Sequence, residues 1–258
     1  VKLKDGSVRR IEENSTILDL AKSISKKLGK SAVVGEVNGT LVDLSYKLKN
    51  NDEVNIITYD DEAGVEVMRH TTSHVMAQAV KRLYKDVKLA IGPTIENGFY
   101  YDFDIEVPFN NEDLVKIEEE MNKIIKEDIS IKRIVLSREE ALRLMEERGE
   151  PYKVELIKDL SEEETISLYK QGDFIDLCRG PHLLSTKGIK DFKLTSVAGA
   201  YWKGNEKNKM LQRVYGVAFA NKDILKTYLN NIEEAKKRDH RKLGKELKLF
   251  TFVDEGPG

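Results

Sequence analysis

A break in the pattern at residues 60–64 constrains the fold of this chain more than any other feature. The polar run DDEAG ends an apolar strand pattern, and a helical pattern over 65–84 follows it. The chain has 258 residues, which suffices for two modest domains and a connector. The sequence therefore predicts a boundary here, between a small unit over 1–60 and a larger unit over 61–225.

The first unit is predicted to be a small α+β domain. Thr16 and Asp19 have the spacing of a capping box, and the apolar residues after them repeat at helical steps until Gly29. Asn38-Gly39 is typical of a type I′ turn and predicts a hairpin. The order of strands around one helix suggests a β-grasp layout. Strands are expected over 8–11, 33–37, 40–42 and 53–59.

The second unit mixes helices and strands without strict alternation, so we expect a larger α+β domain. Ser137 and Glu140 mark another capping box, and Pro151 suits the first turn of a helix. A charged helical pattern then runs over 222–249, and we assign a linker helix to 226–248. The other helices are expected over 65–84, 114–124, 137–149 and from 151; strands are expected over 87–91, 99–105, 129–136, 165–171, 174–177, 198–203 and 211–219.

Composition excludes several classes of protein. Hydrophobic residues make up 40% of the chain, which allows a packed core and argues against global disorder. No apolar run reaches 18 residues, so we expect no association with a membrane. The single cysteine, Cys178, excludes an internal disulfide framework and indicates a reducing, cytoplasmic location.

The charge is unevenly distributed along the sequence. Between residues 203 and 248 there are 13 Lys or Arg residues against 6 Asp or Glu residues, although the net charge of the chain is −2. Such asymmetry is typical of an end that faces nucleic acid. It is equally typical of a solvated helix with mixed charges, and the charge pattern alone does not choose between them.

Three of the four histidines fall into two short motifs. His70 and His74, in HTTSH, are four residues apart and so share one face of the predicted helix. Cys178 and His182, in DLCRGPH, flank a Gly-Pro turn that holds a thiol near an imidazole. Each motif alone is weak evidence for a functional site. Such histidines are often structural, and a free cysteine usually behaves as a small buried hydrophobic residue.

Together the two motifs carry more information. Three imidazoles and one thiolate make up a tetrahedral zinc set. The same groups suit the handling of a water molecule, because histidine titrates near neutral pH and can act as a general base. Lys153 could stabilise an oxyanion or position the attacking water, although an isolated lysine is more often a surface residue. The residues leave both chemistries open.

Five segments, in order, resemble threonyl-tRNA synthetase of the bacterial type. The resemblance covers essentially all 258 residues and implies a TGS domain over 1–60 and an editing domain over 61–225. It also implies that the class II aminoacylation core begins over 249–258. The segments are HTTSH, IGPTIENGFYYDFD at 91–104, DLCRGPH at 176–182, AGAYWKGNEKNKMLQRVYG at 198–216 and RDHRKLGKEL at 238–247.

The resemblance implies a proofreading activity, the hydrolysis of mischarged seryl-tRNA(Thr) at its aminoacyl ester. A missing methyl group supports only about 1–3 kcal/mol of discrimination, so a synthetic site alone makes errors. By the same resemblance, Lys153 and His70 handle the attacking water, and Tyr101 and Asp176 bind the substrate. The residues implied to be catalytic are His70, His74, Lys153, Cys178 and His182.

The resemblance also implies which cofactors and partners to expect. No cofactor is expected for these residues, because the zinc and ATP of such enzymes belong to an aminoacylation core beyond Gly258. The expected partner is the acceptor end of tRNA(Thr) carrying serine. The chain is expected to be a monomer, whereas full-length relatives are dimers. Should a metal be present, the candidate ligands are His70, His74, Cys178 and His182.

Two other functions agree with part of the sequence. One is a zinc-dependent aminoacyl-tRNA deacylase of the alanyl type, because alanyl editing domains share the HxxxH and CxxxH motifs. The other is a non-catalytic fragment that binds tRNA, with which the basic excess over 203–248 is compatible. The TGS-like residues and the segment at 91–104 argue against the alanyl type.

Overall fold

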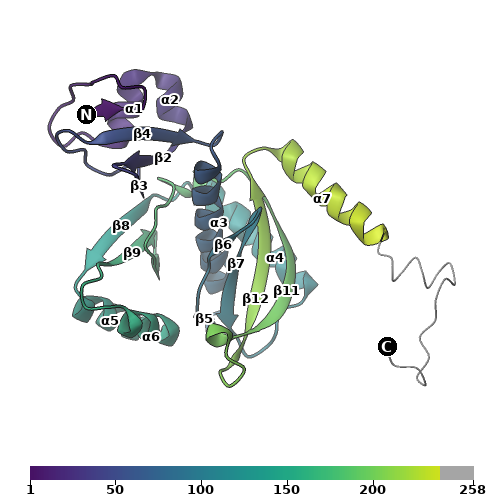
Figure 1. The fold of residues 1–258 in the computed structure, drawn as a ribbon. Coiled ribbons are helices and arrows are strands. Elements are labelled where there is room, and N and C mark those ends of the chain that lie inside the picture. The colour runs from purple at the N-terminus through teal and green to yellow at the C-terminus, as the bar shows by residue number, and fades with distance from the viewer. Residues whose placement is uncertain (239–258) are drawn as a thin grey trace, which may run out of the picture. The chain divides into compact units, whose positions relative to one another are not determined.

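The computed structural model describes residues 1–238 (Figure 1). Contacts divide the chain into two compact units, Val1–Ala220 and Asn221–Gly258. The second unit contains helix α7 (Lys222–Lys237), which lies within the helical pattern predicted over 222–249. The predicted start of an aminoacylation core at 249–258, and the RDHRKLGKEL motif after its first residue, lie outside the described residues.

The first 60 residues form a four-stranded sheet with two short helices, which agrees with the predicted β-grasp layout. The strand order is β1-β4-β2-β3, with β1 parallel to β4 and the other pairs antiparallel. The predicted hairpin is confirmed, since Asn38 and Gly39 have φ angles of 50° and 80°, as a type I′ turn requires. The elements are β1 (Lys2–Leu3), α1 (Ile17–Ile24), α2 (Lys26–Ser31), β2 (Ala32–Val37), β3 (Thr40–Val42) and β4 (Glu53–Thr58).

Two local predictions for this part are wrong. Val8 makes only an isolated bridge to Lys2, so no strand forms over 8–11. The helix expected to continue to Gly29 ends at Ile24, because Ser25 adopts an extended backbone and its side chain caps the next helix, α2. The serine side chain thus competes with the helix it would otherwise continue, and Gly29 lies inside α2 rather than after it.

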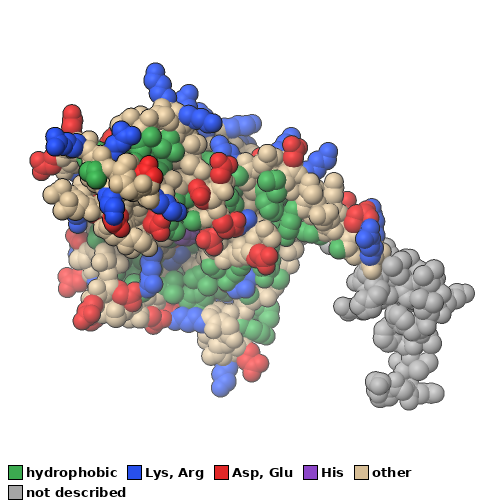
Figure 2. Space-filling view, turned by 45° about the horizontal axis from the view of Figure 1, so that its top comes forward, with side chains coloured by type: hydrophobic (Ala, Val, Ile, Leu, Met, Phe, Trp, Pro, Cys, Tyr) green, Lys and Arg blue, Asp and Glu red, His purple; other side chains and the backbone are tan. Residues whose placement is uncertain are grey.

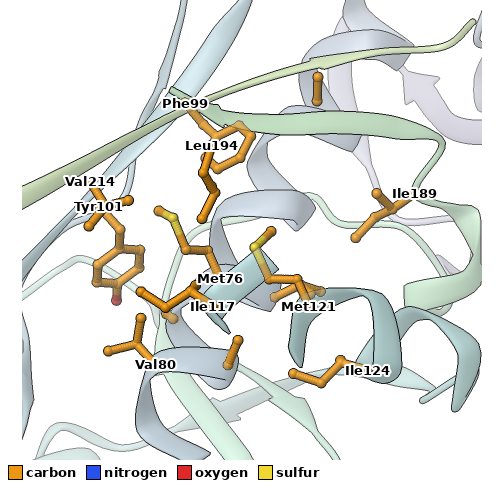
Figure 3. Close-up of a cluster of buried hydrophobic side chains, with 14 of the residues drawn as sticks. Met76, Val80, Phe99, Tyr101, Ile117, Met121, Ile124, Ile189, Leu194 and Val214 are labelled. Carbon is orange, nitrogen blue, oxygen red and sulfur yellow. The ribbon is translucent and has the colours of Figure 1, made fainter. Parts of the chain in front are cut away.

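A long central helix, α3 (Glu62–Leu83), packs against a sheet and a second helix in the larger domain (Figure 1). The sheet has the order β11-β12-β7-β5, with β6 also paired to β7. Met76 of α3, Ile117 of α4 and Phe99 of β7 meet in the main core (Figure 3). The other elements are β5 (Lys88–Leu89), β6 (Thr94–Ile95), β7 (Gly98–Asp104), α4 (Asn111–Lys126), β11 (Asp191–Tyr201) and β12 (Met210–Phe219).

A second, smaller sheet carries part of the candidate site. Its order is β10-β9-β8, all antiparallel, and helices α5 and α6 share its core. The capping box of Ser137 and Glu140 and the position of Pro151 in the first turn of α6 are both confirmed. The elements are β8 (Ile131–Leu136), α5 (Arg138–Glu147), α6 (Pro151–Asp159), β9 (Ile166–Gln171) and β10 (Phe174–Leu177). Among residues 1–238, no helix has the length and apolar character needed to cross a membrane.

Candidate functional site

Helix α3 supplies the first pair of histidines from the middle of the larger domain. From Thr71 to Val80 every residue of the helix is buried, so its polar side chains need partners inside the protein. His70 and His74 lie one turn apart, with their ring centroids separated by 5.1 Å. Ser73 Oγ lies 2.8 Å from the carbonyl oxygen of His70 and 2.9 Å from that of Gly92. The serine therefore ties this turn of the helix to the segment before β6.

The second motif follows strand β10. Asp176 belongs to the strand, and the turn after it carries Cys178, Gly180 and His182. Gly180 has a φ of 74°, and a Cβ atom there would lie 1.9 Å from the Tyr169 hydroxyl, so only glycine fits. The Gly180 N–H donates to Cys178 Sγ at 3.2 Å. The turn predicted from Gly-Pro is present, and it brings the thiol and the imidazole together.

The two motifs meet in one cluster. Cys178 Sγ lies 3.3 Å from Nε2 of His70 and 3.3 Å from Nε2 of His182, and the His74 and His182 ring centroids are 4.2 Å apart. The four donor atoms all lie within 4.8 Å of one another. His74 and His182 are buried, whereas His70 and Cys178 are half-buried, so the cluster is open on their side. Figure 2 accordingly shows only a small area of histidine surface.

Thr71 determines the tautomer of His182. The Thr71 hydroxyl donates to the carbonyl oxygen of Val67 at 2.9 Å and lies 3.1 Å from His182 Nδ1. Because the hydroxyl hydrogen is engaged, we assign the proton of this second contact to Nδ1, which donates to Thr71. His182 Nε2 therefore keeps its lone pair and faces Cys178 as an acceptor.

A buried ion pair lies beside the cluster. Lys153 Nζ, on α6, lies 2.5 Å from Asp176 Oδ1 and donates to the Tyr101 hydroxyl at 3.0 Å. Tyr101 in turn donates to Asp176 Oδ2 at 2.6 Å, and His74 Nε2 lies 3.6 Å from the same oxygen. Lys153 is 3% exposed and Asp176 is 1% exposed. Charges enclosed in this way are retained only when they are paired and hydrogen-bonded.

Burial keeps the histidine and cysteine side chains uncharged near neutral pH. It lowers the pKa of His70, which Asp176 partly opposes, and it lowers the pKa values of His74 and His182 well below 6.5. Burial also raises the pKa of the Cys178 thiol to about 12. The site therefore offers neutral imidazoles that can accept a proton, together with a thiol that is not a thiolate.

The structure brings all seven predicted site residues into one contiguous group, while their catalytic and binding roles stay predictions. They are His70, His74, Tyr101, Lys153, Asp176, Cys178 and His182. Sequence reasoning missed Thr71, although it lies inside the HTTSH motif that signals the site. It also missed Tyr169, whose ring centroid is 4.4 Å from that of His182, and Asp43 of the first domain, which accepts the His182 backbone N–H at 2.9 Å.

The donor set offers the atom types of a tetrahedral metal site at close range, but its charge state does not match. Zinc–ligand bonds of about 2.0–2.3 Å separate neighbouring ligand atoms by about 3.5 Å, which is close to the sulfur–nitrogen distances of 3.3 Å. Thr71 also orients His182 for coordination through Nε2. A metal would have to displace the proton of Cys178, whose pKa burial raises to about 12.

Two family models match the chain. The TGS domain model matches residues 1–58. The model described as the threonyl and alanyl tRNA synthetase second additional domain matches residues 166–215. The second match contains β9, β10 and the turn with Cys178 and His182, so it includes half of the histidine and cysteine cluster.

Relatives that match over the whole length of this chain agree with the two domain matches. The chain is 66% identical to a threonine–tRNA ligase of Acetivibrio thermocellus, 60% to one of Caldanaerobacter subterraneus and 58% to one of Desulforamulus reducens. Each match covers 100% of this chain and 40–41% of the relative, so the chain spans about two fifths of their length. Over its whole length the chain therefore corresponds to the N-terminal region of threonine–tRNA ligases, with a TGS domain and a threonyl and alanyl tRNA synthetase second additional domain.

Proposed function

We propose that this chain is the proofreading part of a threonine–tRNA ligase and hydrolyses the aminoacyl ester of mischarged seryl-tRNA(Thr). The observation that carries the proposal is the contact between a buried Lys153–Asp176 pair and a cluster of neutral imidazoles. The partner is the acceptor end of tRNA(Thr). The chain is expected to be monomeric in the absence of tRNA, which sedimentation equilibrium would check.

Asp176 is proposed to bind the amino group of the substrate. In the structure its Oδ2 accepts the Tyr101 hydroxyl, while its buried Oδ1 faces the Lys153 ammonium at 2.5 Å without a well-directed hydrogen bond. The ammonium group of a seryl ester is a second cation of the kind that this buried carboxylate attracts. Its binding to Asp176 weakens the hold on Lys153, so that the lysine ammonium is free to face the ester carbonyl.

Hydrolysis then requires a base and a donor for the developing oxyanion. A water molecule on the open side of the cluster attacks the ester carbonyl carbon and gives a proton to His70. The carbonyl oxygen becomes an oxyanion, which the Lys153 ammonium stabilises. Breakage of the bond to the ribose oxygen returns the proton from His70 to that oxygen, and the products are serine and tRNA.

Cys178 is proposed to remain a protonated thiol during this reaction. Burial raises its pKa to about 12, so a thiolate that could form an acyl-enzyme is scarce at neutral pH. Its contacts with His70 and His182 instead fix the spacing of the two rings. The site must also exclude the methyl group of threonine, and a closely packed wall can do so because an added methylene costs about 1–3 kcal/mol.

The four ligand atoms within 4.8 Å favour a second candidate, a zinc-dependent deacylase of the alanyl type. His70, His74, Cys178 and His182 would hold the ion, which would act as a Lewis acid toward the ester. This candidate predicts stoichiometric zinc in the purified protein and loss of activity on chelation.

The test compares the release of serine and threonine from tRNA(Thr), with and without a chelator. The proposal predicts that serine is released faster than threonine and that the chelator has no effect. Loss of release on chelation, restored by zinc, would support the second candidate. Release of neither amino acid, with tRNA still bound, would contradict both and leave the non-catalytic tRNA-binding function.

Lys153→Ala tests the proposed role of the lysine. Loss of one oxyanion donor typically slows a reaction about 10²–10³-fold, and we expect a fall of this size in the rate constant for serine release. Lys158→Ala is the matched control, since this lysine lies on the same helix and is exposed. An unchanged rate for Lys153→Ala would contradict the mechanism even if serine specificity holds.

A further inference from the structure

A carboxylate of the TGS domain lies against the turn that carries Cys178 and His182. Asp43 follows strand β3, which lies beside β8 and β9 of the larger domain (Figure 1). Its Oδ1 accepts the backbone N–H of His182 at 2.9 Å, and its Oδ2 accepts the hydroxyl of Tyr169 at 2.8 Å. These partners are 139 and 126 residues away in the sequence. Both oxygens are therefore used to join the two domains at the site.

Tyr169 transmits this contact to the turn. The tyrosine is 2% exposed, and its ring lies against the His182 imidazole at a centroid distance of 4.4 Å. Its hydroxyl is packed so closely against Gly180 that a Cβ atom there would lie 1.9 Å away. The bond from Asp43 to this hydroxyl therefore holds the surface on which the turn rests.

His182 is consequently held from three directions. Asp43 accepts its backbone N–H, Thr71 binds its Nδ1 atom and the Tyr169 ring packs against its imidazole at a tilt of 59°. Two of these restraints come from the larger domain. The third comes from the TGS domain, and Asp43 also accepts the hydroxyl of the tyrosine that packs against the ring.

We propose that Asp43 is a positioning residue of the hydrolytic site and that the TGS domain is thereby a structural part of that site. Asp43 acts on protein groups, so its loss should loosen the turn with Cys178 and His182 rather than remove a contact with substrate. The consequence for serine release rests on the proposed function; the consequence for the turn does not. Burial raises the pKa of Asp43, as expected for a carboxylate enclosed between two domains.

The reactivity of Cys178 provides a readout that needs no substrate. It is the only cysteine in the chain, so alkylation by iodoacetamide at a fixed pH reports on this turn alone. Asp43→Ala removes two hydrogen bonds to a charged group, and the turn with Cys178 should then open more often and expose the thiol. We expect the alkylation rate to rise about tenfold. Serine release should show a comparable fall in kcat, with KM for the tRNA within about twofold.

Asp43→Asn separates positioning from charge. The amide oxygen can still accept the His182 N–H, and the amide group can donate to the Tyr169 oxygen, so both bonds can form without the charge. The Asp43 charge itself raises the pKa of Cys178, and its removal alone would therefore increase thiolate. Positioning predicts that Asp43→Asn resembles the wild type, whereas an alkylation rate equal to that of Asp43→Ala would overturn the proposal.

Tyr59→Phe is the matched control for the domain interface. The Tyr59 hydroxyl donates to the Gly188 carbonyl oxygen at 2.6 Å, which is also a bond between the two domains but away from the Cys178 turn. The proposal predicts unchanged alkylation and kcat in this variant. If Tyr59→Phe and Asp43→Ala changed the alkylation rate and kcat equally, any loss of bonding between the domains would have the same effect. That result would overturn the proposal for Asp43.

The outcome stays interpretable if one part fails. If the wild type releases no serine, the proposed function fails, but the alkylation rates still decide the role of Asp43. If Asp43→Ala does not fold, Tyr169→Phe replaces it, since this change removes only the hydroxyl that Asp43 binds. An unchanged alkylation rate in Tyr169→Phe would then overturn the proposal.

Discussion

At the scale of single residues, burial sets the charge state of this site. Three imidazoles and a thiol lie within 4.8 Å of one another, and burial disfavours the charged form of each. A buried ion pair of Lys153 and Asp176 lies beside them. The site therefore combines neutral proton acceptors with a paired cation and anion. Measurements of the free energy of unfolding test both features.

The histidines make stability depend on pH. Because the pKa values of His74 and His182 are lowered in the folded protein, the unfolded chain binds more protons once the pH falls below about 6.5. The free energy of unfolding is therefore highest above this pH. Below it, the free energy of unfolding falls by up to about 1.4 kcal/mol per pH unit for each histidine. Urea unfolding at pH 7.5, 6.5 and 5.5, with a chelator present, measures the slope. His182→Gln should flatten it, and an identical slope in the variant would contradict the assignment.

The ion pair should show strong coupling in a double-mutant cycle. Asp176→Asn leaves the Lys153 ammonium buried without its counter-charge, which typically costs about 3–5 kcal/mol. Adding Lys153→Met removes the unpaired charge and should recover part of the loss. The free energy of unfolding in urea measures all four corners of the cycle. Simple additivity of the two changes would argue against a buried pair.

At the scale of elements, side chains at the boundaries set where helices begin. Capping boxes at Thr16, Asn110 and Ser137 start three helices, and each satisfies backbone N–H groups that a helix leaves free. The central helix α3 begins differently. Its N-cap residue, Asp61, makes no side-chain cap, and the first turn instead packs closely against the end of β4 through Gly64.

Gly64→Ala should therefore destabilise the protein, against the usual helix preference. Alanine normally improves a helix by about 0.5–1 kcal/mol over glycine. At this position the added Cβ atom would lie 2.0 Å from the carbonyl oxygen of Thr58, so we expect a net loss of about 1–3 kcal/mol. Urea unfolding measures the difference. Glu66→Ala, on the exposed side of the same turn, is the control and should change stability by less than about 0.5 kcal/mol.

At the scale of the whole molecule, the two domains of the unit Val1–Ala220 share a core. Val33 and Val34 of β2 and Ile57 of β4 belong to the same buried cluster as Val67 and Met68 of α3. The cluster continues into the main sheet and α4 (Figure 3). The TGS domain is thus packed against the larger domain by apolar side chains as well as through Asp43.

We expect this unit to unfold in one cooperative transition. The only tryptophan, Trp202, lies in the larger domain and reports on it by fluorescence, whereas far-UV circular dichroism reports on both domains. Their urea midpoints should coincide. Val34→Ala, in the TGS domain, should lower the free energy of unfolding by about 2 kcal/mol. Both urea midpoints should therefore fall together. A shift of the circular dichroism signal alone would show that the domains unfold independently.

Prediction from the sequence succeeds where the signal is local. The Asn38-Gly39 hairpin, the Ser137 cap and the start of α6 at Pro151 all depend on residues within a few positions of one another. The prediction failed at Ser25, where a capping side chain competes with helix propensity over a single residue. The polar run near residue 60 is likewise a local signal, and the domain boundary placed there stays a prediction.

The sequence alone predicts that His70 lies beside His74 and that Cys178 lies near His182, because the four-residue spacing and the Gly-Pro turn are local properties. The resemblance added Tyr101 and Asp176, and it gave a specific role to Lys153, which the residues alone had offered as a candidate. The pairing of Lys153 with Asp176, the contact of Thr71 with His182 Nδ1 and the bond from the His182 N–H to Asp43 could be found only from the folded structure. These contacts join residues 23 to 139 positions apart, and such pairings depend on how the sheets and helices pack together, which no local pattern encodes.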